Sequence, residues 1–119
     1  MNVVVLGASK NEERYSNMAV RRLKDTGHNV YPVHKAIKEI HGIAVYNELS
    51  DIKDKIDTIT VYVNKIVSNN IGAEILDLKP RRIIFNPGAE NYELKEKAEA
   101  QGIDVVFGCT LVMLSTGMF

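Results

Sequence analysis

The sequence has few of the features that mark secreted, nucleic-acid-binding and membrane proteins. Its single cysteine, Cys109, cannot form an internal disulfide, which favours a reducing, cytoplasmic environment. Lys and Arg together number 15, as do Asp and Glu, so the basic excess typical of a nucleic-acid binder is missing. No signal peptide is recognisable at the start, and the longest apolar tract, residues 105–119, is too short to span a bilayer. We therefore expect a cytoplasmic protein that binds neither nucleic acid nor membrane.

Five short apolar runs recur along the chain, and each predicts a buried β-strand. The apolar residues within a run are consecutive rather than alternating, which is typical of strands covered on both faces. The predicted strands are residues 3–6, 30–33, 58–63, 82–85 and 104–107.

Helical spacing of apolar residues predicts helices between these strands. Gly27 and Gly102 suit helix C-termini, Pro80 ends another helix, and Ser50 could cap a short turn. The predicted helices are residues 17–27, 67–79 and 91–102, with a weaker turn at 50–55. The alternation of strands and helices predicts a three-layer α/β fold with a mainly parallel sheet of about five strands. With 119 residues and no linker, the chain is expected to form a single domain over residues 1–119.

The first predicted strand ends at Gly7, and a polar segment leads from it into the first helix. Ligands of such sheets bind at the carboxyl ends of strands, and a helix N-terminus attracts anions. Gly7 can take the tight turn, and the small residues after it let backbone N–H groups approach a ligand. The residues expected around a phosphate or diphosphate are Gly7, Ala8, Ser9, Lys10, Arg14 and Ser16. Because neither G-x-G-x-x-G nor the P-loop pattern is present, a plain strand-to-helix turn stays open as an alternative.

The second predicted strand ends in Pro32, Val33, His34 and Lys35, without the carboxylate that binds the ribose of NAD. His34 and Lys35 could instead meet a phosphate on the ribose, or could be exposed loop residues. Pro32 and Val33 could line an adenine slot or belong to the core. The residues at this end of the strand disfavour NAD as the ligand and favour a ligand whose ribose carries a phosphate.

Two more polar clusters follow strands that should end at the same edge of the sheet. Asn86, Pro87 and Gly88 follow the fourth strand, and Val63 and Asn64 close the third. Asn86 could bond a ligand amide or a neighbouring backbone group, and Gly88 permits close approach of the chain. A plain turn is the alternative for Asn-Pro-Gly.

Taken together, these motifs resemble those of a known family. The motifs are Gly7-Ala8-Ser9, Arg14-Tyr15-Ser16, Tyr31-Pro32-Val33, Gly42 with Tyr46 and Leu49, the segments 57–64 and 86–91, and Cys109. The chain resembles the small stand-alone CoA-binding proteins, whose fold is similar to the N-terminal domain of the succinyl-CoA synthetase α subunit. The resemblance covers essentially the whole chain and implies a Rossmann-like domain that binds coenzyme A or an acyl-CoA.

The resemblance also implies where the parts of the ligand would lie. The diphosphate would lie over Ala8, Ser9 and the first helix, assisted by Lys10, Arg14 and Ser16, and the adenosine near Pro32, Val33 and His34. The pantetheine arm would run past Val63 and Asn64 toward Asn86, Pro87 and Gly88, ending near Cys109. The family typically has Pro-Val-Asn-Pro where this chain has Pro32-Val33-His34-Lys35, so the chain departs from the family at the expected adenosine end.

The sequence shows no catalytic set. Its three histidines lack metal-ligand spacing, and there is no G-x-S-x-G motif. Glu90 could act as a base or simply interact with a helix dipole, and Cys109 could be a small buried residue or form a mixed disulfide with CoA. We therefore expect a binding protein that is not catalytic alone. The alternatives are an NADP-binding module, a small CoA-dependent transferase or thioesterase, and an interaction module whose apolar tail, residues 111–114 and 118–119, pairs in a homodimer.

Overall fold

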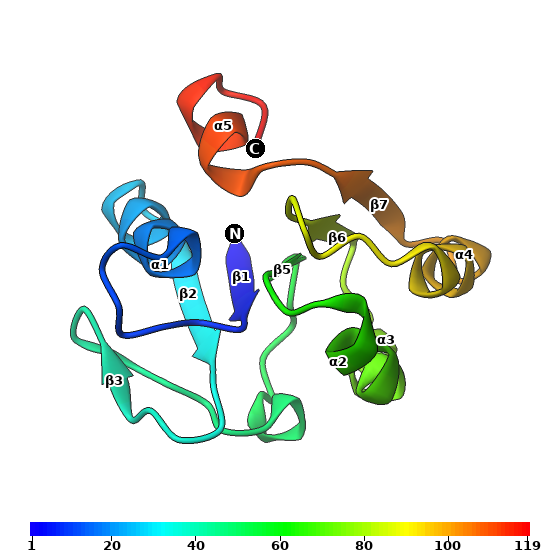
Figure 1. Cartoon of the computed structure of the whole chain (residues 1–119), viewed down its shortest axis with the longest axis horizontal. Coiled ribbons are helices and arrows are strands. Elements are labelled where there is room, and N and C mark those ends of the chain that lie inside the picture. Colours follow the sequence, from blue (N-terminus) through cyan, green and yellow to red (C-terminus); the bar gives the residue numbers. More distant parts are fainter.

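A computed structural model describes residues 1–119 and contains one five-stranded parallel sheet. Its strands are β1 (Asn2–Leu6), β2 (Asn29–Val33), β5 (Thr58–Val61), β6 (Arg82–Phe85) and β7 (Asp104–Phe107), in the order β2-β1-β5-β6-β7 (Figure 1). The chain runs outward from β1 to β2 and then returns to the other side of β1 to form β5. The strand order therefore reverses between β1 and β5, where ligands of such sheets bind.

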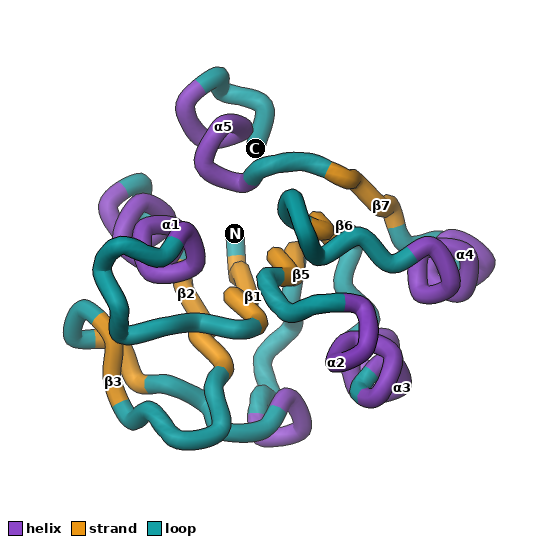
Figure 2. Tube along the Cα trace, in the orientation of Figure 1, coloured by secondary structure: helices purple, strands orange, loops and turns teal.

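Helices cover both faces of the sheet and complete the predicted three-layer, Rossmann-like fold (Figures 1 and 2). On one face lie α1 (Tyr15–Asp25) and α5 (Thr110–Ser115). On the other lie α2 (Lys65–Asn70), α3 (Gly72–Asp77) and α4 (Tyr92–Ala100). None of these helices combines the length and apolar character needed to cross a membrane.

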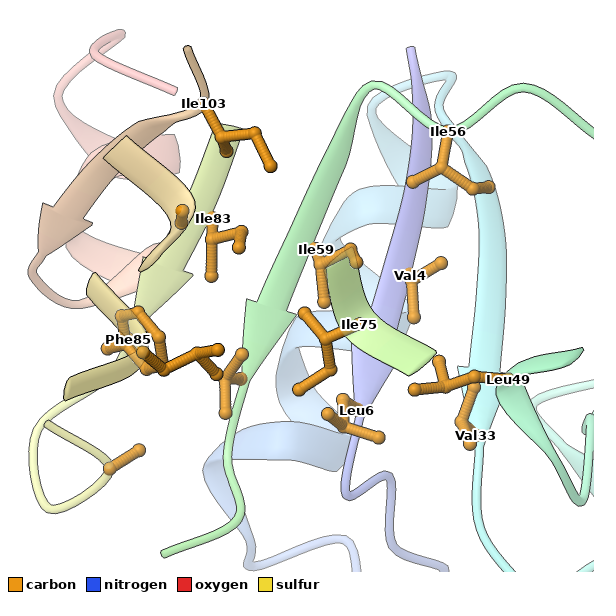
Figure 3. Packing of buried hydrophobic residues seen from close by; sticks show 14 of the residues in the cluster. Val4, Leu6, Val33, Leu49, Ile56, Ile59, Ile75, Ile83, Phe85 and Ile103 are labelled. Atoms are coloured by element: carbon orange, nitrogen blue, oxygen red, sulfur yellow. The ribbon is translucent and has the colours of Figure 1, made fainter. Parts of the chain in front are cut away.

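The core consists of two apolar layers, because consecutive strand residues point to opposite faces. Val3 and Val5 pack toward Val20 and Leu23 of α1. The larger layer contains alternate residues of β1, β5 and β6 together with Ile75 of α3 (Figure 3). Because the strands are covered on both faces, their apolar residues are consecutive in the sequence, as the prediction assumed.

Several element boundaries differ from the sequence prediction. The third strand of the sheet ends at Val61 rather than at residue 63, and α1 begins at Tyr15, two residues before the predicted start. The short turn is a 3-10 helix, η1 (Leu49–Asp51); its N-cap residue is Glu48, so the predicted Ser50 cap is wrong.

The helix predicted over residues 67–79 is two helices, α2 and α3, separated at Ile71. Apolar residues keep their helical spacing across this break, so the sequence pattern does not reveal it. A Cβ built on Gly72 would lie 3.3 Å from Leu94 Cδ1. The glycine therefore allows α3 to start close against α4.

Two elements were missed by the sequence prediction. A small antiparallel hairpin of β3 (Glu39–Ile40) and β4 (Ile43–Ala44) lies between the second predicted strand and the predicted turn at 50–55. The apolar tail forms α5, and Leu114 and Phe119 pack against the α1 side of the core while Val112 stays exposed. Strands of two residues and a six-residue helix are too short to produce a clear periodic pattern.

Candidate functional site

The crevice at the point of strand reversal begins with the turn after β1. Gly7 has φ +89°, and a Cβ there would lie 2.9 Å from Val63 Cγ1, so the tight turn expected at this glycine is confirmed. The N–H groups of Gly7 and Ala8 donate to the carbonyl oxygen of Val33 at 3.2 and 3.1 Å. These two amides hold the turn against the end of β2 and already have partners.

The loop from this turn to α1 is held by its own side chains. The N–H of Asn11 donates to Ser9 Oγ at 3.1 Å, and the N–H of Glu13 donates to Asn11 Oδ1 at 3.0 Å. Asn17 Nδ2 donates to the carbonyl oxygen of Ser9 at 2.8 Å from within α1. The loop is therefore organised before any ligand binds.

The N-terminus of α1 has unsatisfied donors. Arg14 is its N-cap residue and makes no capping hydrogen bond through its side chain. The N–H groups of Tyr15 and Ser16 have no partner in the chain. Ser16 is 5% exposed as a residue, and its hydroxyl, which is not among the fully buried polar atoms, makes no hydrogen bond within the chain. Together with the positive end of the helix dipole, these donors form a site suited to an anion.

A cavity of about 510 Å³ opens directly over these donors. It is lined by Gly7, Ala8, Ser9, Glu13, Arg14, Tyr15, Ser16, His34 and Tyr62. Arg14 is exposed and forms no ion pair, so its guanidinium is free to bind a ligand. Glu13 brings one negative charge to the same wall, which the charge of Arg14 offsets.

A second, apolar cavity of about 330 Å³ adjoins the first, and both are lined by Gly7 and His34. Its apolar walls are Leu6, Val33, Leu49, Val63 and Ile71, and its polar lining is His34, Lys35, Asn47, Glu48 and Glu74. His34 Nδ1 accepts from the N–H of Ala36 at 3.0 Å, so its Nε2 is the protonated nitrogen of the neutral ring. A flat apolar group can fit this cavity, and His34 stands where the two cavities meet.

The structure adds one carboxylate that the end of β2 does not itself carry. Glu48 reaches the apolar cavity from a later segment. Tyr46 pairs alongside β2, with its N–H donating to the Pro32 carbonyl oxygen at 2.8 Å and its carbonyl oxygen accepting from the His34 N–H at 3.0 Å. The carboxylate is near the strand end in space and distant in sequence.

Two asparagines among the predicted site residues have structural partners. Asn64 caps α2 by accepting from the N–H of Val67 at 3.0 Å. Asn86 is 2% exposed; its Nδ2 donates to Thr60 Oγ1 at 2.7 Å, and its Oδ1 accepts from the N–H of Thr110 at 2.9 Å. Asn86 therefore uses its amide to join β5 and α5, the neighbouring-backbone alternative named above.

Four other predicted residues do not line either cavity. Lys10 faces a separate hollow beside Asn17 and His41, and Pro32 is buried within β2. Pro87 and Gly88 are exposed after β6, where the carboxylate of Glu90 accepts from the Gly88 N–H at 3.0 Å.

Tyr62 lines the first cavity and was missed as a site residue. Burial raises its pKa to about 12, so the hydroxyl stays protonated at neutral pH. The hydroxyl is buried and makes no hydrogen bond, although Thr60, Cys109 and Thr110 lie nearby. Cys109 itself is a partly buried free thiol that precedes α5. Apolar residues surround Tyr62 in sequence, so only its place in the structure reveals the link to the cavity.

Comparisons with known proteins identify the relatives of this chain. The family model described as "CoA binding domain" matches residues 1–115. An acetate–CoA ligase (ADP-forming) from Methanocaldococcus jannaschii is 33% identical over 100 residues, which cover 81% of this chain and 14% of the ligase. The chain thus spans a small part of that relative.

Solved structures show the same fold over nearly the full chain. The crystal structure of an uncharacterized protein is 43% identical, with a TM-score of 0.90, and the match covers 99% of this chain and 97% of the other. A Thermus thermophilus protein is 26% identical with a TM-score of 0.89, over 99% of this chain and 90% of its own.

Proposed function

Because this chain belongs to the CoA-binding domain family, we propose that residues 1–119 form a single cytoplasmic domain that binds coenzyme A or an acyl-CoA. The observation that carries the proposal is the N-terminus of α1. There the unpartnered Ser16 hydroxyl, two free N–H groups and the unpaired Arg14 surround one cavity. The Ser16 residue is mostly buried, but it lines this cavity and its hydroxyl has no partner in the chain, so the hydroxyl can donate to a ligand there.

Arg14, Ser16 and the amides of the first turn of α1 would hold the diphosphate. Charge-assisted hydrogen bonds from guanidinium groups and helix N-termini are the usual protein contacts of phosphates. Gly7, Ala8 and Ser9 would shape the floor of this cavity, with Lys10 contributing charge from outside it.

The adjoining apolar cavity would hold the adenine, against Val33 and Leu49. His34 and Lys35 would contact the phosphate on the ribose, since both line this cavity and His34 also lines the diphosphate cavity. Pro32 would support this wall from within β2. The His34–Lys35 pair occupies the position at which the family usually has Asn-Pro.

The pantetheine arm would leave along the carboxyl ends of β5 and β6. Val63 lines the apolar cavity, and the exposed Pro87 and Gly88 offer backbone on the far side. Asn86 would shape this path through the elements that it joins, whereas the exposed Asn64 uses only its Oδ1 in the cap of α2 and keeps its Nδ2 free to donate. Cys109 would stand near the end of the arm. With no catalytic arrangement assigned to it, the domain would bind CoA without converting it.

Isothermal titration with CoA tests the diphosphate site. Replacing Arg14 with Ala should weaken binding by about 1.5–3 kcal/mol, because a charge-assisted phosphate contact is lost. Arg21→Ala is the matched control: Arg21 lies on the same helix, its side chain is 69% exposed, and its one ion pair is with Asp25 at 3.9 Å. Equal dissociation constants for the two variants would place the diphosphate elsewhere, and no heat of binding from the unmodified protein would refute CoA binding.

The position of His34 and Lys35 also supports a second candidate, NADP. Their donors could bind a 2′-phosphate as well as the 3′-phosphate of CoA, and Glu48 could accept from a sugar hydroxyl. Thermal-shift curves with CoA, dephospho-CoA and NADP separate the two. CoA binding predicts the largest shift with CoA and a smaller one with dephospho-CoA, which lacks the 3′-phosphate. A shift with NADP alone would favour NADP.

A further inference from the structure

The two edges of the sheet differ in how they are protected. At the β2 edge, the segment around Tyr46 pairs with Val33, and Pro32 removes one backbone donor. At the β7 edge, no segment of the chain pairs with the strand, and the strand contains no proline (Figure 1). Exposed edge strands pair readily with other strands unless the chain covers or interrupts them. The β7 edge is therefore open to a further strand.

The free backbone groups of β7 can be assigned from its pairing with β6. The N–H groups of Asp104 and Gly108 donate inward, to the carbonyl oxygens of Arg81 at 3.0 Å and Phe85 at 3.1 Å. Since successive residues of a strand alternate, the N–H and C=O groups of Val105 and Phe107 point outward. The outer edge thus offers two donors and two acceptors in a row.

We propose that β7 pairs antiparallel with β7 of a second copy of this chain, so that two sheets join into one continuous sheet in a symmetric dimer. A two-fold axis beside Val106 sets Val105 opposite Phe107 of the other copy, and Phe107 opposite Val105. Each such pair exchanges two hydrogen bonds. The two pairs together satisfy the four outward groups of each strand. A two-fold axis beside Val105 would instead require the N–H of Ile103, which already donates to the carbonyl oxygen of Ala98 at 3.1 Å.

The side chains are compatible with this register. Val105, Val106 and Phe107 are only half-buried, and pairing would cover them. Asp104, the single charged residue of the strand, would stand opposite the uncharged Gly108 of the other copy, so no like charges face each other. A strand that is complementary to itself about a two-fold axis selects a second copy as its partner.

The molar mass in solution tests the dimer. At about 100 μM, sedimentation equilibrium should give twice the chain mass of 13.3 kDa. Val105→Pro should give the mass of one chain with an unchanged circular dichroism spectrum, because the lost N–H points outward and proline is tolerated at sheet edges. Val112→Asp, on the exposed face of α5, should leave the dimer mass unchanged. A monomeric unmodified protein, a dimeric Val105→Pro variant, or dissociation by Val112→Asp alone would each overturn the proposal.

A disulfide tests the register even if Val105→Pro fails to fold. In a Cys109→Ser background, Val106→Cys places one thiol on each side of the axis. The two residues at position 106 form a non-hydrogen-bonded pair, whose Cα atoms lie about 4.5 Å apart. This distance is within the range that a disulfide can bridge. Mild oxidation should convert most of this variant to a covalent dimer. Val112→Cys in the same background should stay mostly uncrosslinked. Equal crosslinking at the two positions, or none at position 106, would rule out this pairing.

Discussion

Ser16 is a buried residue whose hydroxyl has no partner within the chain. Replacing it with Ala should therefore change the free energy of unfolding of the free protein by no more than about 0.5 kcal/mol, since no internal hydrogen bond is lost. The same change should weaken CoA binding, because the hydroxyl is a proposed phosphate donor. Urea denaturation and isothermal titration on one preparation measure both effects. A variant that loses stability but binds CoA normally would assign Ser16 a purely structural role.

Gly7 shows how a single position can depend on both backbone and packing. Gly7→Ala should lower the free energy of unfolding by about 2–4 kcal/mol, because the residue has positive φ and the new Cβ would press on Val63. Gly27→Ala is the control: Gly27 has φ +87°, but no atom lies within 4 Å of its added Cβ. Urea denaturation of both variants isolates the Val63 contact. Equal losses would show that the turn relaxes around it.

At the residue scale, the sequence prediction succeeded where chemistry is local. A glycine after a buried strand predicted a tight turn, and the structure contains it. The prediction could not tell that the Asn86 amide is used inside the protein, since its partners Thr60 and Thr110 lie 26 and 24 residues away. It also missed Tyr62 and Glu48, which reach the cavities only through the packing of separate segments.

At the scale of elements, Asn91 joins α4 to α2. It caps α4 by accepting from the Leu94 N–H at 2.9 Å, and its Nδ2 donates to Ser68 Oγ and Asn69 Oδ1, both at 2.8 Å. Asn91→Ala should lower the free energy of unfolding by about 2–4 kcal/mol, because it removes a cap and leaves buried groups unpaired.

Asn64→Ala is the matched control for that change. Asn64 also caps a helix, but it is exposed and makes only the capping bond, so the loss should be about 1 kcal/mol. Chemical denaturation followed by circular dichroism measures both variants. If the two losses are equal, the bonds from Asn91 to α2 contribute nothing beyond the cap.

At the scale of the whole molecule, His28 lies where segments distant in sequence meet. Its Nδ1 is 3.2 Å from the α-amino nitrogen of Met1, and its ring lies 5.3 Å from that of Phe119, which the Arg82 guanidinium overlies at 4.6 Å. Burial first, and then the charges of Met1 and Arg82, lower the pKa of His28 below 6.5. The native state therefore resists protonation more than the unfolded chain does.

The sign of the resulting pH dependence follows from proton linkage. As the pH falls below about 6.5, the unfolded chain takes up the proton first, so the free energy of unfolding should decrease. His28→Gln should flatten this decrease between about pH 6.5 and the lower pKa of the native state. Urea denaturation at a series of pH values gives the two slopes. Identical slopes would mean that other groups cause the pH dependence.

The sequence by itself determined the α/β class, the five strands and the place of the tight turn at Gly7, because consecutive apolar residues and a glycine act locally. Only the tertiary structure decided which groups are free to bind a ligand. The amides of Gly7 and Ala8 are used by β2 and that of Asn86 by its neighbours, whereas Ser16 and Arg14 are left without partners. Whether a hydrogen-bonding group has a partner depends on segments distant in the sequence, and those contacts form only when the chain is folded.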